Sequence, residues 1–188
     1  MNEVTKFLST HEPRLTKWAR AVFAASCVQR LMPVYLGYCA RQEIAPLFED
    51  WLDIAWNVLA GEVQVSQQEL EEYNAEGLAE LRGESAPGVQ EAGMAVLHVL
   101  AELRGSGLAV QACSKTNFEQ IGSYLWNKLG VPLDALWRHR LVEDEKKRQE
   151  RDLEELIAMG EPGSQAKADV VAELRDRAQR EGLAYLVP

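Results

Sequence analysis

Hydrophobic residues recur every three or four positions along most of this chain, the spacing that gathers them on one face of an α-helix. Apolar and polar residues nowhere alternate cleanly over six positions, as a half-buried β-strand requires. Alanine, leucine, glutamate, glutamine and arginine, which favour helices, recur throughout. The sequence therefore predicts an all-α fold.

Proline, glycine and capping residues divide the chain into about seven or eight helices. A short helix over Glu3–Leu8 comes first, and a long one begins near Pro13 and carries apolar residues over a wide arc, which predicts a central position. Pro33 is expected to end or kink that helix, and a short helix through residues 34–39 follows. Further helices are predicted from Pro46 to Gly61, after the capping pair Ser66 and Glu69, and over residues 89–103, 108–128, 134–159 and 164–180.

The 188 residues are sufficient for one ordinary hydrophobic core, and 47% of them are apolar. There is no repeat of fixed period and no long linker. We therefore expect residues 1–188 to form a single compact helical bundle. The segment Gly83–Gly88 is predicted to be a loop, and the apolar tail Leu183–Pro188 is predicted to dock on the bundle.

The N-terminus shows no basic stretch followed by an apolar segment and a cleavage site, and no apolar run could span a bilayer. These features favour a cytoplasmic protein without a membrane partner. Cys27, Cys39 and Cys113 lack metal-ligand spacing and are interpreted as free thiols in a reducing compartment.

No catalytic, cofactor-binding or metal-binding motif is present in the sequence. His11, His98 and His139 lie on different predicted segments, and none stands beside a cysteine in a known catalytic pattern. His98 is interpreted as a core or border residue. Gly105-Ser106-Gly107 is interpreted as a helix connector because no strand precedes it. We expect a protein that is not an enzyme and needs no cofactor.

Charge is distributed unevenly along the chain. Between Arg41 and Arg82 there are ten acidic residues and no lysine or arginine, whereas the net charge of the whole chain is -9. The acidity is therefore regional, and it disfavours nucleic acid as a partner. The residues chosen as a candidate surface for a basic partner are Asp50, Asp53, Glu69, Glu72, Glu76 and Glu80.

Glu72, Glu76 and Glu80 are spaced by four and follow Glu69, so they form one ridge on the helix after Ser66. An alternative is that these residues only stabilise the helix N-terminus, remain solvated, or pair with Arg148 or Arg151. The later pairs Glu143 with Lys147, Asp144 with Arg148, and Arg151 with Glu155 are interpreted as an exposed helix face.

The segments Phe23–Cys27, Gln29–Tyr35 and Leu52–Trp56 resemble the opening of the YjaG-like family of helical bacterial proteins. Residues 143–156 and the ending Glu181-Gly182-Leu183 resemble its C-terminal part. Related helical proteins resemble the immunity partners of bacterial toxins. The resemblance and the acidic ridge together lead us to expect an immunity protein that occludes a cognate toxin or effector domain with a basic surface. The alternative is a helical housekeeping protein that self-associates, and a homodimer is compatible with either.

Overall fold

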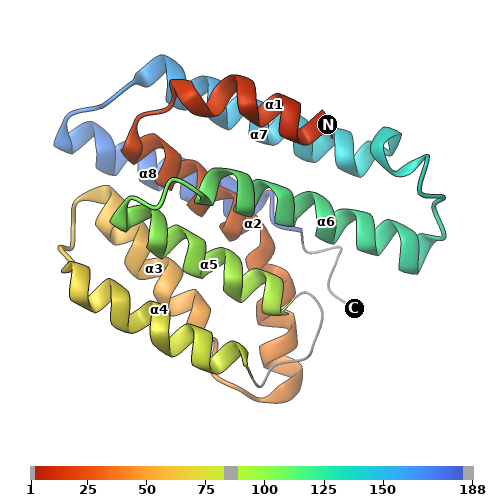
Figure 1. Ribbon diagram of the computed structural model, residues 1–188, viewed down its shortest axis with the longest axis horizontal. Helices are drawn as coiled ribbons and strands as arrows, with labels where there is room; N and C mark the ends of the chain where they lie inside the picture. The colour runs from red at the N-terminus through yellow and green to blue at the C-terminus, as the bar shows by residue number, and fades with distance from the viewer. Residues whose placement is uncertain (1–2, 83–88, 184–188) are drawn as a thin grey trace.

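A computed structural model of the chain describes residues 3–82 and 89–183, with side chains from residue 6 onward. Figure 1 shows the described residues as a bundle of helices without strands. The eight α-helices are α1 (Glu3–His11), α2 (Lys17–Gln42), α3 (Leu47–Ala60), α4 (Gln67–Leu81), α5 (Val89–Arg104), α6 (Ala109–Leu129), α7 (Arg140–Met159) and α8 (Ser164–Arg180), with short 3-10 helices η1 (Glu12–Arg14) and η2 (Leu136–Arg138). The predicted all-α fold of seven or eight helices is confirmed.

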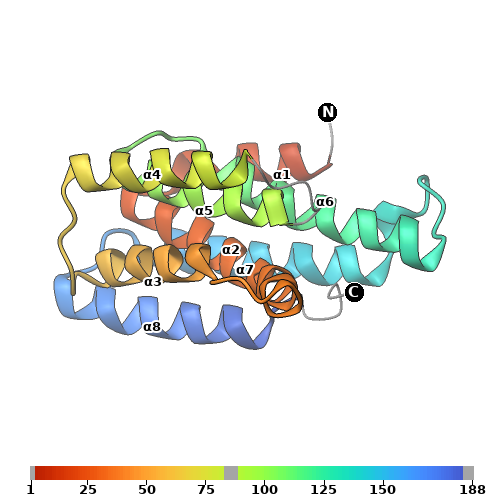
Figure 2. The ribbon, with the colours of Figure 1, turned by 90° about the horizontal axis from the view of Figure 1, so that it is seen from below.

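Helix α2 lies at the centre of the bundle, as its wide apolar arc predicts. It packs against α3, α5, α6, α7 and α8, and from Ala21 to Met32 all of its residues are buried. Figure 2 shows α4 and α5 on one side of the bundle and α3 and α8 on the other. The N-cap residue of α2 is Thr16, whose side chain accepts a hydrogen bond from the backbone N–H of Ala19.

Pro33 does not end α2, which continues to Gln42, so the separate short helix predicted over residues 34–39 is wrong. Proline has no N–H, and its ring crowds the preceding turn, so the helix can continue only with a local change of direction. Figure 1 shows that change about halfway along α2.

The segment after α8 packs against the turn of α2 that contains Pro33. The backbone N–H of Leu183 donates to the carbonyl oxygen of Arg30 at 2.7 Å, and Leu183 is fully buried. A Cβ atom added at Gly182 would lie 2.8 Å from Cγ of Pro33, so only glycine lets the two backbones approach this closely. Leu183 is the first residue of the predicted docking tail, and residues 184–188 lie outside the described part of the chain.

Several predicted helix ends are confirmed by their caps. Gly61 adopts φ 80° after α3, and α4 begins with the capping box in which Ser66 and Glu69 bond to each other's backbone N–H at 3.2 and 2.7 Å. The α5–α6 turn is held by buried Glu102, whose carboxylate pairs with Arg20 and accepts from the N–H of Ala109. The predicted loop Gly83–Gly88 lies outside the described residues.

Helix α7 begins at Arg140, six residues after the predicted start at Asp134. The chain forms a turn after Pro132 and then η2, and His139 has extended backbone angles of φ -75° and ψ 139°. The single helix predicted over residues 134–159 is therefore not continuous, and its helical part begins at Arg140. The Nδ1 atom of His139 accepts a hydrogen bond from the N–H of Leu141 and so caps the new helix.

Two glycines allow close packing of α4 and α5 on their neighbours. A Cβ atom at Gly77 of α4 would lie 2.5 Å from the Trp51 ring, and one at Gly93 of α5 would lie 2.7 Å from the Phe48 ring. The two rings lie edge to face, with centroids 5.4 Å apart, and both are buried. No helix in the described ranges is both long and apolar enough to cross a bilayer.

Candidate functional site

The acidic residues of α4 are exposed on an outer helix of the bundle. Glu69, Glu72, Glu76 and Glu80 are all solvent-accessible, and α4 packs mainly on α5. The Glu69 carboxylate is engaged in the capping box, and its hydrogen bonds with Ser66 lower its pKa. Glu72 accepts a hydrogen bond from Gln68. Within residues 6–82 and 89–183, no lysine, arginine or histidine forms an ion pair with Glu72, Glu76 or Glu80.

The structure does not bring Asp53 to the α4 ridge. Asp53 pairs with Arg175 of α8, whereas Trp51, two residues earlier on α3, packs against Tyr73 of α4 with ring centroids 5.9 Å apart. Residues two apart project from nearly opposite sides of a helix. Asp50 is exposed. The predicted set therefore divides into a ridge on α4, the solvated Asp50 and the paired Asp53.

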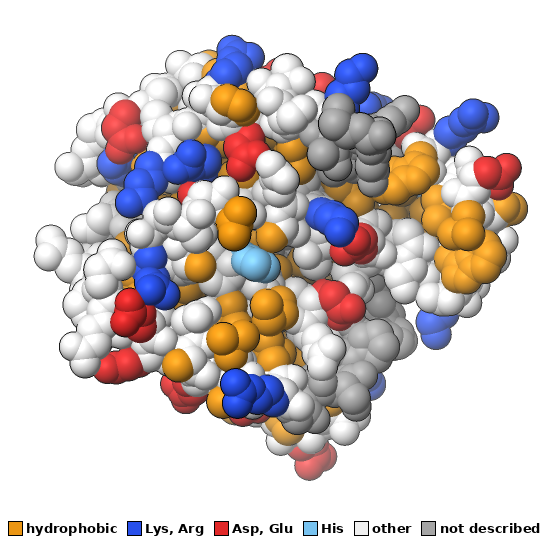
Figure 3. Space-filling model, viewed as in Figure 1, with side chains coloured by type: hydrophobic (Ala, Val, Ile, Leu, Met, Phe, Trp, Pro, Cys, Tyr) orange, Lys and Arg blue, Asp and Glu red, His pale blue; other side chains and the backbone are white. Residues whose placement is uncertain are grey.

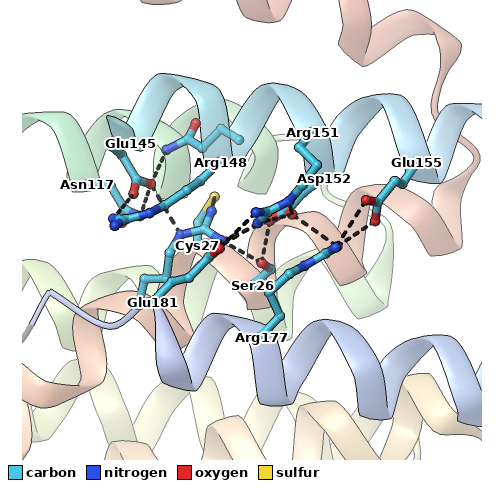
Figure 4. A network of polar contacts seen from close by, with 12 residues as sticks. Ser26, Cys27, Asn117, Glu145, Arg148, Arg151, Asp152, Glu155, Arg177 and Glu181 are labelled. Carbon is cyan, nitrogen blue, oxygen red and sulfur yellow. Dashed lines mark hydrogen bonds and ion pairs between the residues drawn. The ribbon is translucent and has the colours of Figure 1, made fainter. Parts of the chain in front are cut away.

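Arg148 and Arg151, the arginines considered as partners of the ridge, pair instead with Glu145, Asp152 and Glu181. They belong to a largely buried network that the sequence did not predict. Figure 4 shows this network between α2, α6, α7 and α8. Arg30 of α2 is fully buried, and its guanidinium donates to Glu145 at 3.3 Å and to Asp152 at 2.9 Å. We call the following residues the Arg30 network: Ser26, Cys27, Arg30, Ser114, Asn117, Glu145, Arg148, Gln149, Arg151, Asp152, Glu155, Arg177 and Glu181.

Glu145 is fully buried and accepts several hydrogen bonds through one oxygen. Its Oε1 atom accepts from Asn117 Nδ2 and Gln149 Nε2, each at 2.8 Å, in addition to Arg30 Nε. Its Oε2 atom lies 3.6 Å from Nη1 of Arg148. This arrangement compensates the charge of a carboxylate that has no access to water.

Asp152 lies among three guanidinium groups. Arg30 and Ser26 donate to its Oδ2 atom, and Arg151 and Arg177 approach its Oδ1 atom at 3.0 and 3.2 Å. Burial would raise the pKa of Asp152, but the charge and hydrogen bonds of Arg30 and then Arg151 outweigh it and hold that pKa below its ordinary value. Asp152 is therefore ionised in the folded protein at neutral pH.

The outer members of the network attach α8 and the C-terminal segment. Arg151 forms two hydrogen bonds to the Glu181 carboxylate, at 2.8 and 2.9 Å, and Arg177 binds Glu155 in the same two-pronged way. The network contains four arginines and four acidic residues, so it is electrically neutral as a group. The predicted pairs along α7 are replaced by others: Asp144 pairs with Arg140, and Arg148 approaches Glu145. Arg151 binds Asp152 and Glu181, and Glu155 binds Arg177. The same helix also carries Glu145, Gln149 and Asp152, for which no exposure was predicted and which are buried.

A signal for these residues was present in the sequence. The buried positions of α7 are 142, 145, 149, 152, 153 and 156, which is the spacing of one helix face, and polar residues occupy half of them. Arg30 likewise interrupts the apolar run of α2. Charged residues at core positions of two helices indicate that the helices pair through those charges.

The Arg30 network joins α2 to α7 and α7 to α8 through buried charges. Burial raises the pKa of the Cys27 thiol, which lies 3.6 Å from Nη2 of Arg30, so the thiol stays protonated and is a poor nucleophile. Cys27, Cys39 and Cys113 are buried, and none forms a disulfide among the described residues. Among the described residues, no group of three or more histidine, cysteine and acidic side chains is placed to hold a metal ion.

His98 is half-buried, and burial lowers its pKa, as expected for a histidine at the border of the core. Two shallow hollows of about 230 and 280 Å³ lie elsewhere on the described surface. The first lies between α3 and α8 beside Trp56, and the second lies beside Trp18.

A family model described as "Protein of unknown function (DUF416)" matches residues 11–186. The fold is similar to the crystal structure of a DUF416 family protein from Shewanella baltica OS155, with a TM-score of 0.75 and 19% sequence identity. The match covers 95% of this chain and 96% of that one. At this level of identity the similarity shows a shared fold and carries no activity. The search of curated proteins found no match to the chain.

Proposed function

Since the chain belongs to the DUF416 family, which is described as being of unknown function, we propose that it is a non-enzymatic binding protein that captures a basic partner on α4. One observation carries this proposal: Glu72, Glu76 and Glu80 are exposed in one row, and no cation of the described residues pairs with them. Like charges four residues apart destabilise a helix slightly, so a row of them costs stability that a cationic partner would recover.

Fewer acidic residues are available to a partner than the six that were chosen from the sequence. Glu69 is engaged by the capping box and Asp53 by Arg175, so the carboxylates free for a partner are those of Glu72, Glu76 and Glu80, together with exposed Asp50. Leu78 of α4 is 39% exposed and offers a small apolar contact beside the charges. Such a surface speeds association through its field and contributes less to the lifetime of the complex.

The specific form that we favour is a cytoplasmic immunity protein that blocks a cognate toxin whose cleft is basic. The resemblance of residues 23–35 and 52–56 to YjaG-like proteins, and of that group to immunity proteins, supports this form. The alternative is a housekeeping protein of the same fold. The two differ in gene context, because an immunity gene stands beside the gene of its toxin.

The test is to co-express the tagged chain with the product of its neighbouring gene and to analyse the mixture by size-exclusion chromatography. A stoichiometric complex that protects cells from that product supports the immunity function. If neither a complex nor protection is found, the immunity form is wrong.

Charge reversal locates the surface. We reverse the charge of the row in one triple variant, Glu72→Lys, Glu76→Lys and Glu80→Lys. This variant should associate with the neighbouring gene product at least about tenfold more slowly at low salt, and its association rate should depend less on salt. The matched control reverses three other exposed acids, Glu143, Glu154 and Glu173 on α7 and α8, and so changes the net charge equally. Equal slowing by both variants would mean that net charge, and not the α4 row, determines capture.

A further inference from the structure

Four large hydrophobic side chains are exposed on the stretch of chain that runs from the last turn of α6 to η2. Their exposed fractions are 50% for Trp126, 53% for Leu129, 62% for Leu133 and 44% for Trp137. We call these four residues the α6 tip. Figure 3 shows hydrophobic side chains gathered at this end of the molecule, over the end of α6.

The α6 tip is held in shape by the fold. Gly130 ends α6 with φ 64°, and the N–H of Val131 donates to the carbonyl oxygen of Leu125 at 3.0 Å. Trp137 packs against Phe118 of α6, with ring centroids 6.4 Å apart. The exposed rings and leucines therefore belong to a fixed surface and can be covered without reorganising the chain.

The apolar area of this surface can be compared with what a stable dimer needs. With roughly 250 Å² for a whole tryptophan side chain and roughly 120 Å² for a leucine, the exposed fractions amount to roughly 370 Å². Two copies would cover roughly 750 Å², and homodimer interfaces are about 65% apolar. The complete interface would then bury roughly 1,150 Å², which exceeds the roughly 1,000 Å² expected of a biological interface.

The charge distribution also permits two copies to meet at this end. Between Ser123 and Arg140 the chain carries Lys128, Arg138 and Arg140 against one acid, Asp134, so the region is slightly basic in a chain of net charge -9. In Figures 1 and 2 the acidic α4 lies toward the opposite end of the bundle. Like-charge repulsion between acidic regions is therefore weakest when copies approach tip to tip.

We propose that the α6 tip is the self-association surface of the protein, through which two copies form a dimer about a two-fold axis. In such a dimer the same patch of each copy covers that of the other, and Asp134 of one copy can lie near a cation of its partner. This dimer is independent of the capture of a basic partner by α4, because the two surfaces lie on different helices.

The experiment measures the mass of the full chain in solution by sedimentation equilibrium at concentrations up to about 100 μM. The wild-type chain should have twice its mass of 21.1 kDa. The double variant Leu129→Glu and Leu133→Glu should be a monomer, with a dissociation constant raised at least 100-fold, because dimerisation would bury unpaired carboxylates.

The matched control is Leu108→Glu, at a leucine that is 65% exposed at the other end of α6 and should leave the dimer intact. Trp126→Glu serves as a second variant that should also dissociate the dimer if the double variant does not fold, as judged by circular dichroism. A wild-type chain that stays monomeric at about 100 μM would overturn self-association. Dimers that persist in folded tip variants, or that dissociate equally in Leu108→Glu, would overturn the assignment to this surface.

Discussion

Replacing Arg30 with methionine tests whether the Arg30 network stabilises the fold as its geometry implies. The side chain is fully buried, and its removal takes a cation from Glu145 and Asp152 together. Asp152 keeps Arg151 and Arg177 at 3.0 and 3.2 Å. Among the described residues Glu145 keeps one arginine, Arg148, at 3.6 Å, so most of the cost falls on Glu145.

Breaking a buried ion pair by removing one partner costs about 3–5 kcal/mol, because the other charge is left without compensation. The domain as a whole is expected to be stable by about 5–15 kcal/mol, so Arg30→Met should remove a large share. For a chain of this length the midpoint of thermal unfolding should fall by about 6–20 °C. Urea unfolding followed by circular dichroism measures the free energy directly, provided that the slope with urea is unchanged.

A second substitution separates the charge from the loss of packing. In the Arg30→Met background, Glu145→Gln removes the uncompensated charge while its oxygen can still accept from Asn117 and Gln149, so about 1–3 kcal/mol should be recovered. The matched control is Arg140→Met, because Arg140 is 88% exposed and forms a surface pair with Asp144, and it should cost less than about 1 kcal/mol. If Arg30→Met costs no more than Arg140→Met, or if Glu145→Gln recovers nothing, the network does not stabilise the fold through its charges.

Three further measurements follow from the packing of two glycines and from the shifted pKa values of Asp152 and His98. Gly93→Ala should destabilise the fold by about 1–3 kcal/mol because the new methyl group meets Phe48, whereas Gly122→Ala, with no heavy atom within 4 Å, should stabilise it by about 0.5–1 kcal/mol; urea unfolding of both variants distinguishes a packing effect from a general preference for alanine. Asp152 has a folded pKa below its ordinary value of 3.8, so its contribution is present above about pH 4 and is lost as pH falls through the folded pKa; the stability difference between wild type and Asp152→Asn should shrink over that range, and a constant difference would contradict the shift. His98 has a folded pKa below its ordinary value of 6.5, so protonation of the unfolded chain should reduce stability as pH falls below about 6.5; His98→Gln should lose that dependence when unfolding is measured at pH 7 and at about pH 5.5.

Local features of the sequence predict most of the helix ends. The Ser66–Glu69 capping box and Gly61 act within a few residues of themselves, so their effect is visible in the sequence. Pro33 also acts locally, but the outcome depends on what packs against the altered turn. Here the N–H of Leu183 donates to the carbonyl oxygen of Arg30, and that contact joins residues far apart in the chain.

The placement of the acidic residues and of the α7 face required the tertiary structure. Asp53 has no lysine or arginine near it in the sequence, so its pairing could not be predicted. Its partner, Arg175, lies on α8. Arg151 and Glu155 were interpreted as an exposed pair, because charged residues are usually exposed. The burial of Glu145 and Asp152 beside them depends on Arg30, which lies more than 100 residues away. Spacing along α7 places these residues on one face, but only the position of α2 makes that face internal.

The dependence of Arg30 on distant residues also bears on how the protein is made on the ribosome. Helix α2 is synthesised early, yet the carboxylates that neutralise its Arg30 belong to α7. The backbone N–H that donates to the carbonyl oxygen of Arg30 belongs to Leu183, near the C-terminus. Until those residues emerge, a nascent chain would have to bury a lone guanidinium group in order to fold. Completion of the core is therefore tied to synthesis of the C-terminal segment, and a chain terminated before α7 carries an exposed apolar α2 that is a substrate for chaperones and proteases.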